Sequence, residues 1–151
     1  MYQRILVPFD GSDTSCRALD AAVRMARESG GTLRVVHVME DSAYMTGYDP
    51  MGGSSGLLLK AVREGARRIL ADGVERAGQA GLVAEAELLD PPGGRLGSVV
   101  AEAARKWQAD LVVVGTYGRR GLGRVLLGSG AEQVIREATV PVLVIRAAAE
   151  A

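Results

Sequence analysis

The sequence predicts an α/β domain in which an open, five-stranded parallel sheet is covered by helices on both faces. Short apolar runs alternate with segments of helical period five times along the chain, and each helix can serve as the crossover between two parallel strands. Most of the runs are apolar at successive positions, which is typical of strands that helices cover on both faces. A chain of 151 residues is long enough to bury most of its apolar surface as one domain.

The strands are expected where apolar and β-branched residues follow one another. They cover residues 5–9, 33–39, 83–89, 111–114 and 140–145. The third strand differs because Glu85 and Glu87 alternate with apolar residues, which is typical of a strand with one wet face. It is therefore expected at an edge of the sheet.

Four helices are expected between the strands, where apolar residues recur at one-face spacing. They run from after Ser12 to about Ser29, over 57–80, over about 96–107 and from Ser129 to about Ala138. Ser129 is expected to cap the last helix, with Glu132 completing a capping box. Residues 40–56 lack any period, so they either cover a ligand or form a simple insertion. We expect one domain over residues 1–147 and a disordered tail over 148–151.

Residues that suggest function follow two of the strands. Asp10 follows the first, and the segment 115–129 follows the fourth. In open α/β sheets the ligand crevice lies where the strand order reverses, so we expect these strands side by side in the order 3-2-1-4-5. This order leaves the fifth strand at an edge, and an apolar edge invites pairing with another chain. We therefore expect a symmetric homodimer through Val140 to Ile145.

A segment rich in glycine and arginine follows the fourth strand. Six glycines and three arginines lie between residues 115 and 130, and no acidic residue falls between Asp110 and Glu132. Glycines let a ligand approach the main chain, while arginines and the N-terminus of the next helix favour an anion. The segment predicts phosphate binding, with a solvated surface loop as the alternative.

The composition argues against several other functions. Eighteen basic and eighteen acidic residues leave no net charge to attract nucleic acid or a membrane, and no apolar run approaches the ~20 residues of a membrane span. Cys16 and His37 are the only cysteine and histidine, so an intramolecular disulfide, a four-cysteine zinc site and a Ser–His catalytic pair are not expected. We expect Cys16 to be a small packed residue, His37 to be structural and the protein to be cytoplasmic, without a metal site.

The glycine segment does not match two familiar phosphate loops. It has no Gly-Lys-Ser/Thr sequence, and the turn after the first strand lacks the glycines of a dinucleotide fingerprint. Gly115-x2-Gly118, nine further residues and Gly128-Ser129 do resemble the nucleotide-binding motif of the universal stress protein family. The segments 8–12, 36–38, 126–129 and 140–146 are similar to the same family.

This resemblance implies a Rossmann-like fold, similar to adenine nucleotide alpha hydrolases, and a site for ATP. ADP or AMP are the alternatives, and Mg²⁺ would be held through the phosphates. Asp10 would lie near the adenosine, the main chain of Val38 at the adenine, and the glycines and Ser129 along the ribose and phosphates. The implied binding residues are Pro8, Asp10, Val38, Gly115, Gly118, Arg119, Arg124, Gly128, Ser129 and Gly130.

Hydrolysis would require a group that positions a water molecule in line with the γ-phosphate. The segment from Gly115 to Leu127 supplies arginines but no acid, amide or histidine. We therefore expect no catalytic residue, and a nucleotide-responsive binding protein in the stress response, with slow or no hydrolysis. The alternatives are an interaction scaffold that binds no nucleotide and a slow ATPase.

Overall fold

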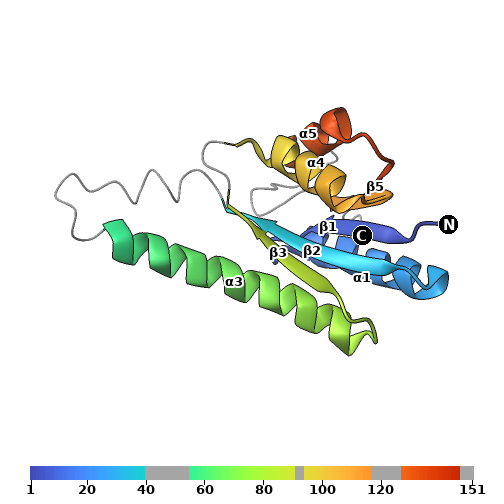
Figure 1. Cartoon of the computed structure of the whole chain (residues 1–151), viewed down its shortest axis with the longest axis horizontal. Coiled ribbons are helices and arrows are strands. Elements are labelled where there is room, and N and C mark those ends of the chain that lie inside the picture. Colours follow the sequence, from blue (N-terminus) through green and yellow to red (C-terminus); the bar gives the residue numbers. More distant parts are fainter. Residues whose placement is uncertain (40–54, 91–93, 117–126, 147–151) are drawn as a thin grey trace, which may run out of the picture.

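The computed structural model describes residues 1–39, 55–90, 94–116 and 127–146. In chain order, the elements are β1 Arg4–Pro8, α1 Asp13–Ser29, β2 Thr32–Val38, α3 Ser55–Gln79, β3 Glu85–Leu89, α4 Leu96–Trp107, β4 Leu111–Gly115, α5 Ser129–Glu137 and β5 Val142–Ile145. Strand and helix therefore alternate along the chain as the sequence predicts (Figure 1).

The five strands form one parallel sheet in the order β3-β2-β1-β4-β5. This confirms the predicted order, including the place of β1 beside β4, where Ile5 pairs with Leu111. Leu6 lies opposite Val112 in the same parallel register, so β1 and β4 end at the same edge of the sheet, at Pro8 and Gly115. The turns that follow β1 and β4 therefore leave the sheet at neighbouring positions.

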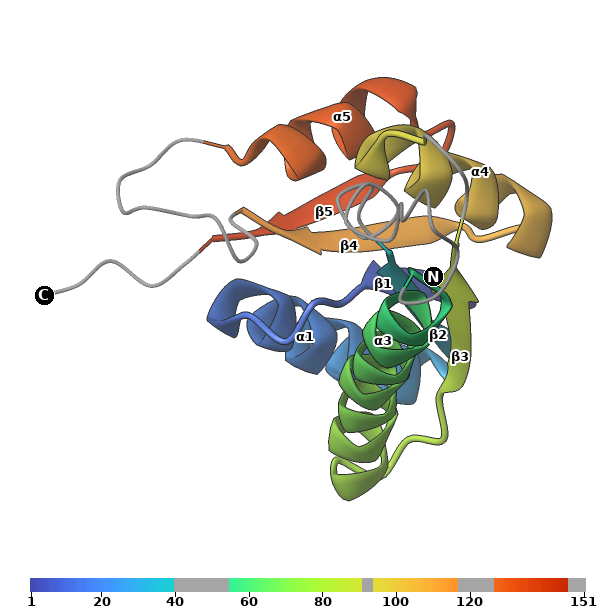
Figure 2. The same ribbon diagram turned by 90° about the vertical axis from the view of Figure 1, so that its left-hand side faces the viewer.

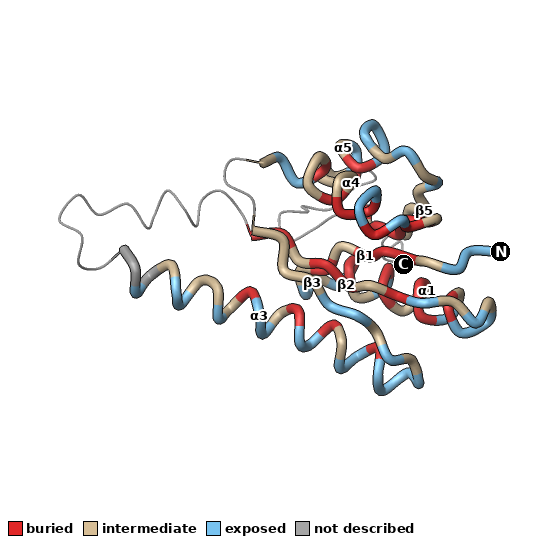
Figure 3. Tube along the Cα trace, viewed as in Figure 1, coloured by how far each residue is buried: buried red, intermediate tan, exposed pale blue. Residues whose placement is uncertain are grey.

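Helices cover the two faces of the sheet in pairs. Helices α1 and α3 lie on one side, and α4 and α5 on the other (Figure 2). Alternate residues of each central strand face opposite sides, so Val35 packs with α1 and α3 while Val36 packs with α4 and α5. Buried residues concentrate on the central strands and on the inward sides of the helices (Figure 3).

The outer strand β3 has a wet face, as predicted. Its residues Glu85 and Glu87 both bind Arg34 of β2, at 2.6 and 2.9 Å. Trp107 ends α4 and is only 6% exposed, which confirms the expected packing of this helix against the sheet. The Arg34 and Arg4 guanidinium carbons lie 4.8 and 4.4 Å from the centre of its ring. Both arginines therefore lie over the Trp107 ring, where Arg4 also donates to the Trp107 carbonyl.

Some local predictions differ from the structure. Gly128, not Ser129, is the N-cap of α5, and the Glu132 carboxylate binds Arg136 at 2.7 Å instead of completing a capping box. The third and fifth strands begin at Glu85 and Val142, each two residues later than predicted, and Val83 is 95% exposed. At the start of α5, the hydrogen bond from the Gly128 N–H to the Thr116 carbonyl outweighs the preference for serine at the N-cap position.

Candidate functional site

The chain makes a tight turn where β1 ends, at Asp10-Gly11-Ser12. The Asp10 carboxylate accepts the Ser12 N–H at 2.9 Å, which is the turn-stabilising role open to an aspartate at this position. Gly11 has a φ of 81°, a left-handed conformation that favours glycine. The Ser12 hydroxyl then caps α1 by accepting the Ser15 N–H at 3.3 Å. The turn is thus fixed by its own side chains before any ligand is considered.

The first turn of α1 packs directly against the end of β4. A β-carbon on Gly115 would lie only 2.7 Å from the carbonyl carbon and oxygen of Thr14 and 2.8 Å from its Cβ. Gly115 is therefore required by the close approach of α1, a reason that the sequence did not reveal. The contact brings the turn after β1 and the end of β4 to one place at the carboxyl edge.

A main-chain hydrogen bond joins Thr116, which follows β4, to Gly128, which precedes α5. The Gly128 N–H donates to the Thr116 carbonyl at 2.6 Å, and the Thr116 N–H donates to Ile145 of β5 at 3.0 Å. Helix α5 begins immediately afterwards, with Ser129 exposed in its first turn. Gly128 has no side chain to cap the helix, whose first N–H groups have no partner within the helix. The arrangement presents main-chain donors at a positive helix end.

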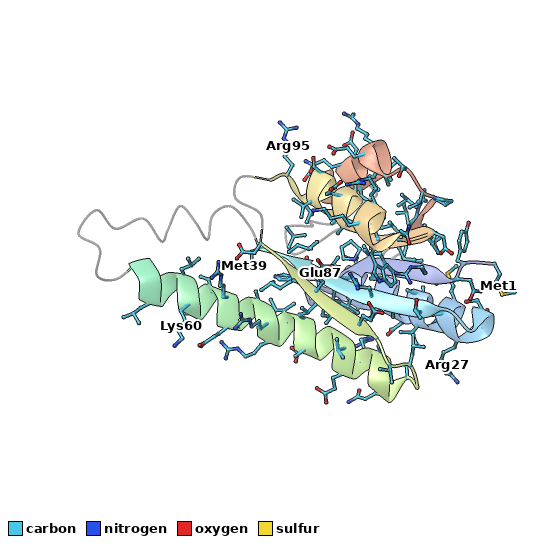
Figure 4. All side chains as sticks on the ribbon, viewed as in Figure 1. Met1, Arg27, Met39, Lys60, Glu87 and Arg95 are labelled. Atoms are coloured by element: carbon cyan, nitrogen blue, oxygen red, sulfur yellow. The ribbon has the colours of Figure 1, made fainter. Side chains whose placement is uncertain are left out.

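Helices α4 and α5 lie against each other near their N-termini. A β-carbon on Gly130 would meet the Leu96 side chain, so Gly130 makes room for Leu96. The Gln133 side chain accepts the Gly97 N–H at 3.1 Å. It thereby stands in for a cap at α4, since the side chain of the N-cap Arg95 makes no capping hydrogen bond. Arg95 points away from the sheet (Figure 4).

The end of β2 borders the same edge. Val38 is 8% exposed, with its side chain in the core under α4 and α5. His37, on the opposite side of the strand, forms a 2.7 Å hydrogen bond between Nδ1 and the Phe9 carbonyl. This confirms the expected structural histidine. Met39 follows at the tip of the sheet (Figure 4), where its N–H donates to Leu89 at 2.9 Å.

Seven of the ten predicted binding residues lie at the carboxyl ends of β1, β2 and β4 or at the start of α5. They are Pro8, Asp10, Val38, Gly115, Gly128, Ser129 and Gly130. The other three, Gly118, Arg119 and Arg124, lie outside the described residues. Sequence reasoning missed Thr14 and Thr116, whose contacts with Gly115 and Gly128 depend on tertiary packing.

Cys16 is a poor candidate for chemistry at this edge. It packs partly buried against the core beneath α1 and α3, as expected, and burial raises the pKa of its thiol. A raised pKa lowers the fraction of reactive thiolate. Over the described ranges, no group of three or more His, Cys, Asp or Glu side chains could hold a metal ion. Nor is any helix in these ranges long and apolar enough to cross a membrane.

Comparison with known sequences decides the family. The sequence model of the Universal stress protein family matches residues 1–146. The chain belongs to this family. Among its relatives, a universal stress protein of Methanocaldococcus jannaschii is 36% identical over 97% of this chain and 83% of the relative. The universal stress protein YxiE of Bacillus subtilis is 32% identical over 97% of this chain and 100% of the relative.

Solved structures of the family share the fold. One from Burkholderia pseudomallei has a TM-score of 0.73 at 33% identity and covers 97% of both chains. Another, in complex with cAMP, has a TM-score of 0.69 at 28% identity over 95% of this chain and 97% of its own. A third, from Archaeoglobus fulgidus in complex with dAMP, has a TM-score of 0.66 at 25% identity over 95% and 98%. Two of these proteins therefore hold adenine nucleotides.

Proposed function

We propose that this universal stress protein binds an adenine nucleotide at the carboxyl ends of β1, β2 and β4. The observation that carries this proposal is the contact of Gly115 with Thr14, by which the first turn of α1, directly after the Asp10 turn, packs against the end of β4. This is the point where the strand order reverses and where open α/β sheets bind ligands. The relatives in complex with cAMP and dAMP support the same ligand class.

ATP is the nucleotide that we propose, with ADP and AMP as alternatives and Mg²⁺ held through the phosphates. Pro8 and Asp10 would border the nucleoside, and the main chain of Val38 would meet the adenine. The phosphates would lie along the glycine segment, where Gly115, Gly118, Arg119 and Arg124 are the proposed contacts. They would end at Gly128, Ser129 and Gly130, because the start of α5 offers N–H donors and a positive dipole.

We further propose that the protein acts as a nucleotide-responsive regulator in the stress response, in the cytoplasm, with slow or no hydrolysis. Asp10 is the carboxylate nearest to the proposed site along the chain, and its oxygen is already engaged by the Ser12 N–H. It would lie at the nucleoside and far from a γ-phosphate. Turnover above about one per second, the low end of typical enzyme rates, would contradict this role.

The first experiment is to denature the purified protein and search the released small molecules for adenine nucleotide by mass spectrometry. Titration calorimetry with ATP, ADP and AMP then measures the affinities. We expect bound nucleotide in the purified protein or a saturable ATP isotherm. Neither release nor binding would favour the scaffold alternative.

Two substitutions at Gly128 test the phosphate end of the site. Gly128 has a φ of −60° and a ψ of 150°, a conformation open to any residue, and both Asp and Asn are good N-caps. Gly128→Asp adds a negative charge beside the phosphates, so ATP affinity should fall about tenfold further than in Gly128→Asn. Adenosine carries no phosphate and should bind both variants equally. Equal losses of ATP affinity in the two variants would place the phosphates elsewhere.

We also propose the homodimer through β5. The Thr116 N–H donates to the Ile145 carbonyl, so the main-chain groups of Val144, one residue earlier, point away from β4 to the open edge. Val144→Pro removes an outward N–H but no bond to β4, and it should yield a monomer. Val144→Ile keeps the N–H and should remain a dimer. Light scattering that returns a monomer for the wild type at micromolar concentration would refute the dimer.

A further inference from the structure

At the end of β1, a side-chain donor takes the place of the main-chain donor that a regular parallel sheet would have. The Phe9 N–H donates to the Val36 carbonyl at 2.8 Å, and a regular parallel ladder would continue with the Val38 N–H donating to the Phe9 carbonyl. That carbonyl instead accepts a hydrogen bond from His37 Nδ1 at 2.7 Å. No main-chain hydrogen bond joins Val38 to Phe9, both of which the structure describes.

The chemistry of this contact fixes the role of the imidazole. A carbonyl oxygen can only accept, so Nδ1 of His37 must carry the hydrogen. The ring is half-buried on the side of β2 that faces α1 and α3, opposite the side chains of Val36 and Val38. His37 therefore joins the ends of β1 and β2 without using the Val38 N–H.

The main-chain N–H and C=O groups of Val38, which do not bond to Phe9, point toward the proposed site. The Val36 carbonyl faces β1 because it accepts the Phe9 N–H, and Val38, two residues later, faces the same side. Its N–H and C=O therefore both point past the end of β1, beside the Asp10 turn. A donor next to an acceptor matches the edge of adenine, which offers the ring N1 as acceptor and the exocyclic N6 as donor. Guanine offers the reverse pattern, a ring N–H beside the O6 acceptor.

We propose that His37 is a positioning residue that sets the preference of this site for adenine over guanine. It does so by holding the Phe9 carbonyl out of line with the Val38 N–H, which stays available for the base. This inference rests on the adenine-nucleotide function proposed above. Without the imidazole donor, the Phe9 carbonyl would close on the Val38 N–H and complete the ladder.

Two substitutions separate the donor from the volume of the ring. In His37→Asn, the amide nitrogen lies the same number of bonds from Cα as Nδ1 and can donate to the same carbonyl. His37→Leu fills similar space and has no donor. Far-UV circular dichroism and thermal unfolding establish that both variants fold.

The first readout needs no nucleotide. Amide hydrogen exchange of Val38, followed by NMR in nucleotide-free protein, should be about tenfold slower in His37→Leu than in the wild type, because the N–H enters the ladder. His37→Asn should exchange like the wild type. Equal exchange rates of the Val38 amide in His37→Leu and the wild type would refute the proposal that His37 prevents the hydrogen bond between the Val38 N–H and the Phe9 carbonyl.

The second readout is the ratio of the ATP and GTP dissociation constants. His37→Leu should lose about tenfold of the preference for ATP, and His37→Asn should restore most of it. An unchanged ratio in His37→Leu would overturn the role in base preference. A wild type that binds neither nucleotide would overturn the proposed function and this preference together. The exchange rate of the Val38 amide would then still decide whether His37 prevents the hydrogen bond from Val38 to the Phe9 carbonyl.

Discussion

Replacing Gly115 by alanine tests the packing that brings the two turns of the candidate site together. The added carbon would lie 2.7 Å from the carbonyl carbon and oxygen of Thr14 and 2.8 Å from its Cβ. Two of these three atoms belong to the main chain, so no rotamer change relieves the clash, and α1 must move away from β4. Overpacking of this kind costs about 1–3 kcal/mol. For a chain of this size, a loss of about 2 kcal/mol lowers Tm by roughly 4–8 °C.

The single tryptophan provides the assay. Trp107 is 6% exposed on the opposite face of the sheet, so its fluorescence reports unfolding in urea without being disturbed directly by the substitution. Gly78→Ala is the matched control: Gly78 has nothing within 4 Å of an added β-carbon and lies within α3. It should therefore stabilise the protein by about 0.5–1 kcal/mol. A Gly115→Ala variant as stable as the wild type would refute the close approach of Thr14.

Two further predictions concern contacts between helices. Asp20 of α1 binds Arg76 of α3 through two hydrogen bonds of 2.7 and 2.8 Å, and hydrogen bonding to Arg76 lowers the pKa of Asp20 from its ordinary value of 3.8. Because this pKa is lower in the folded than in the unfolded protein, the pair stabilises the fold at pH values above the unfolded-state pKa. This stabilisation is lost as the pH falls through the folded-state pKa. Since both side chains are more than a third exposed, Asp20→Asn should cost less than about 1 kcal/mol at pH 7. The difference should shrink below about pH 4 in urea titrations; a difference independent of pH would contradict the pair. Gln133→Met keeps the side-chain shape but removes the acceptor of the Gly97 N–H, and should cost about 1 kcal/mol in the same assay; no loss would contradict its capping role.

The order of the strands was predictable because two independent features agreed. The alternation of Glu85 and Glu87 with apolar residues placed the third strand at an edge, and the positions of Asp10 and Gly115 placed the first strand beside the fourth. The structure has both arrangements. Periodicity and the geometry of crossovers are properties of whole segments, so one atypical residue does not change them.

The N-cap of α5, but not the range of the helix, was predicted one residue too late for a physical reason. Serine is a better N-cap than glycine in isolation, which favoured Ser129. The hydrogen bond from the Gly128 N–H to the Thr116 carbonyl instead fixes the chain at Gly128. That bond joins the end of β4 to the start of α5, and no local sequence pattern encodes it.

The site could be predicted in outline but not in its packing. The glycine spacing indicated which residues follow β4, while the reason for Gly115, its contact with Thr14, depends on how α1 lies on the sheet. The partner of His37, the Phe9 carbonyl, was likewise hidden, although a signal existed. Once β1 and β2 are neighbours in parallel register, a histidine near the end of β2 can reach the carbonyl of Phe9, the residue that follows β1.

A crystal structure would show whether an adenine nucleotide binds at the carboxyl ends of β1, β2 and β4. Crystals would be grown from protein with millimolar ATP and Mg²⁺. We expect adenine at the main chain of Val38 and phosphates at the N–H groups of Ser129 and Gly130. Crystals of protein saturated with ATP that hold no nucleotide between the Asp10 turn and α5 would refute the proposed site.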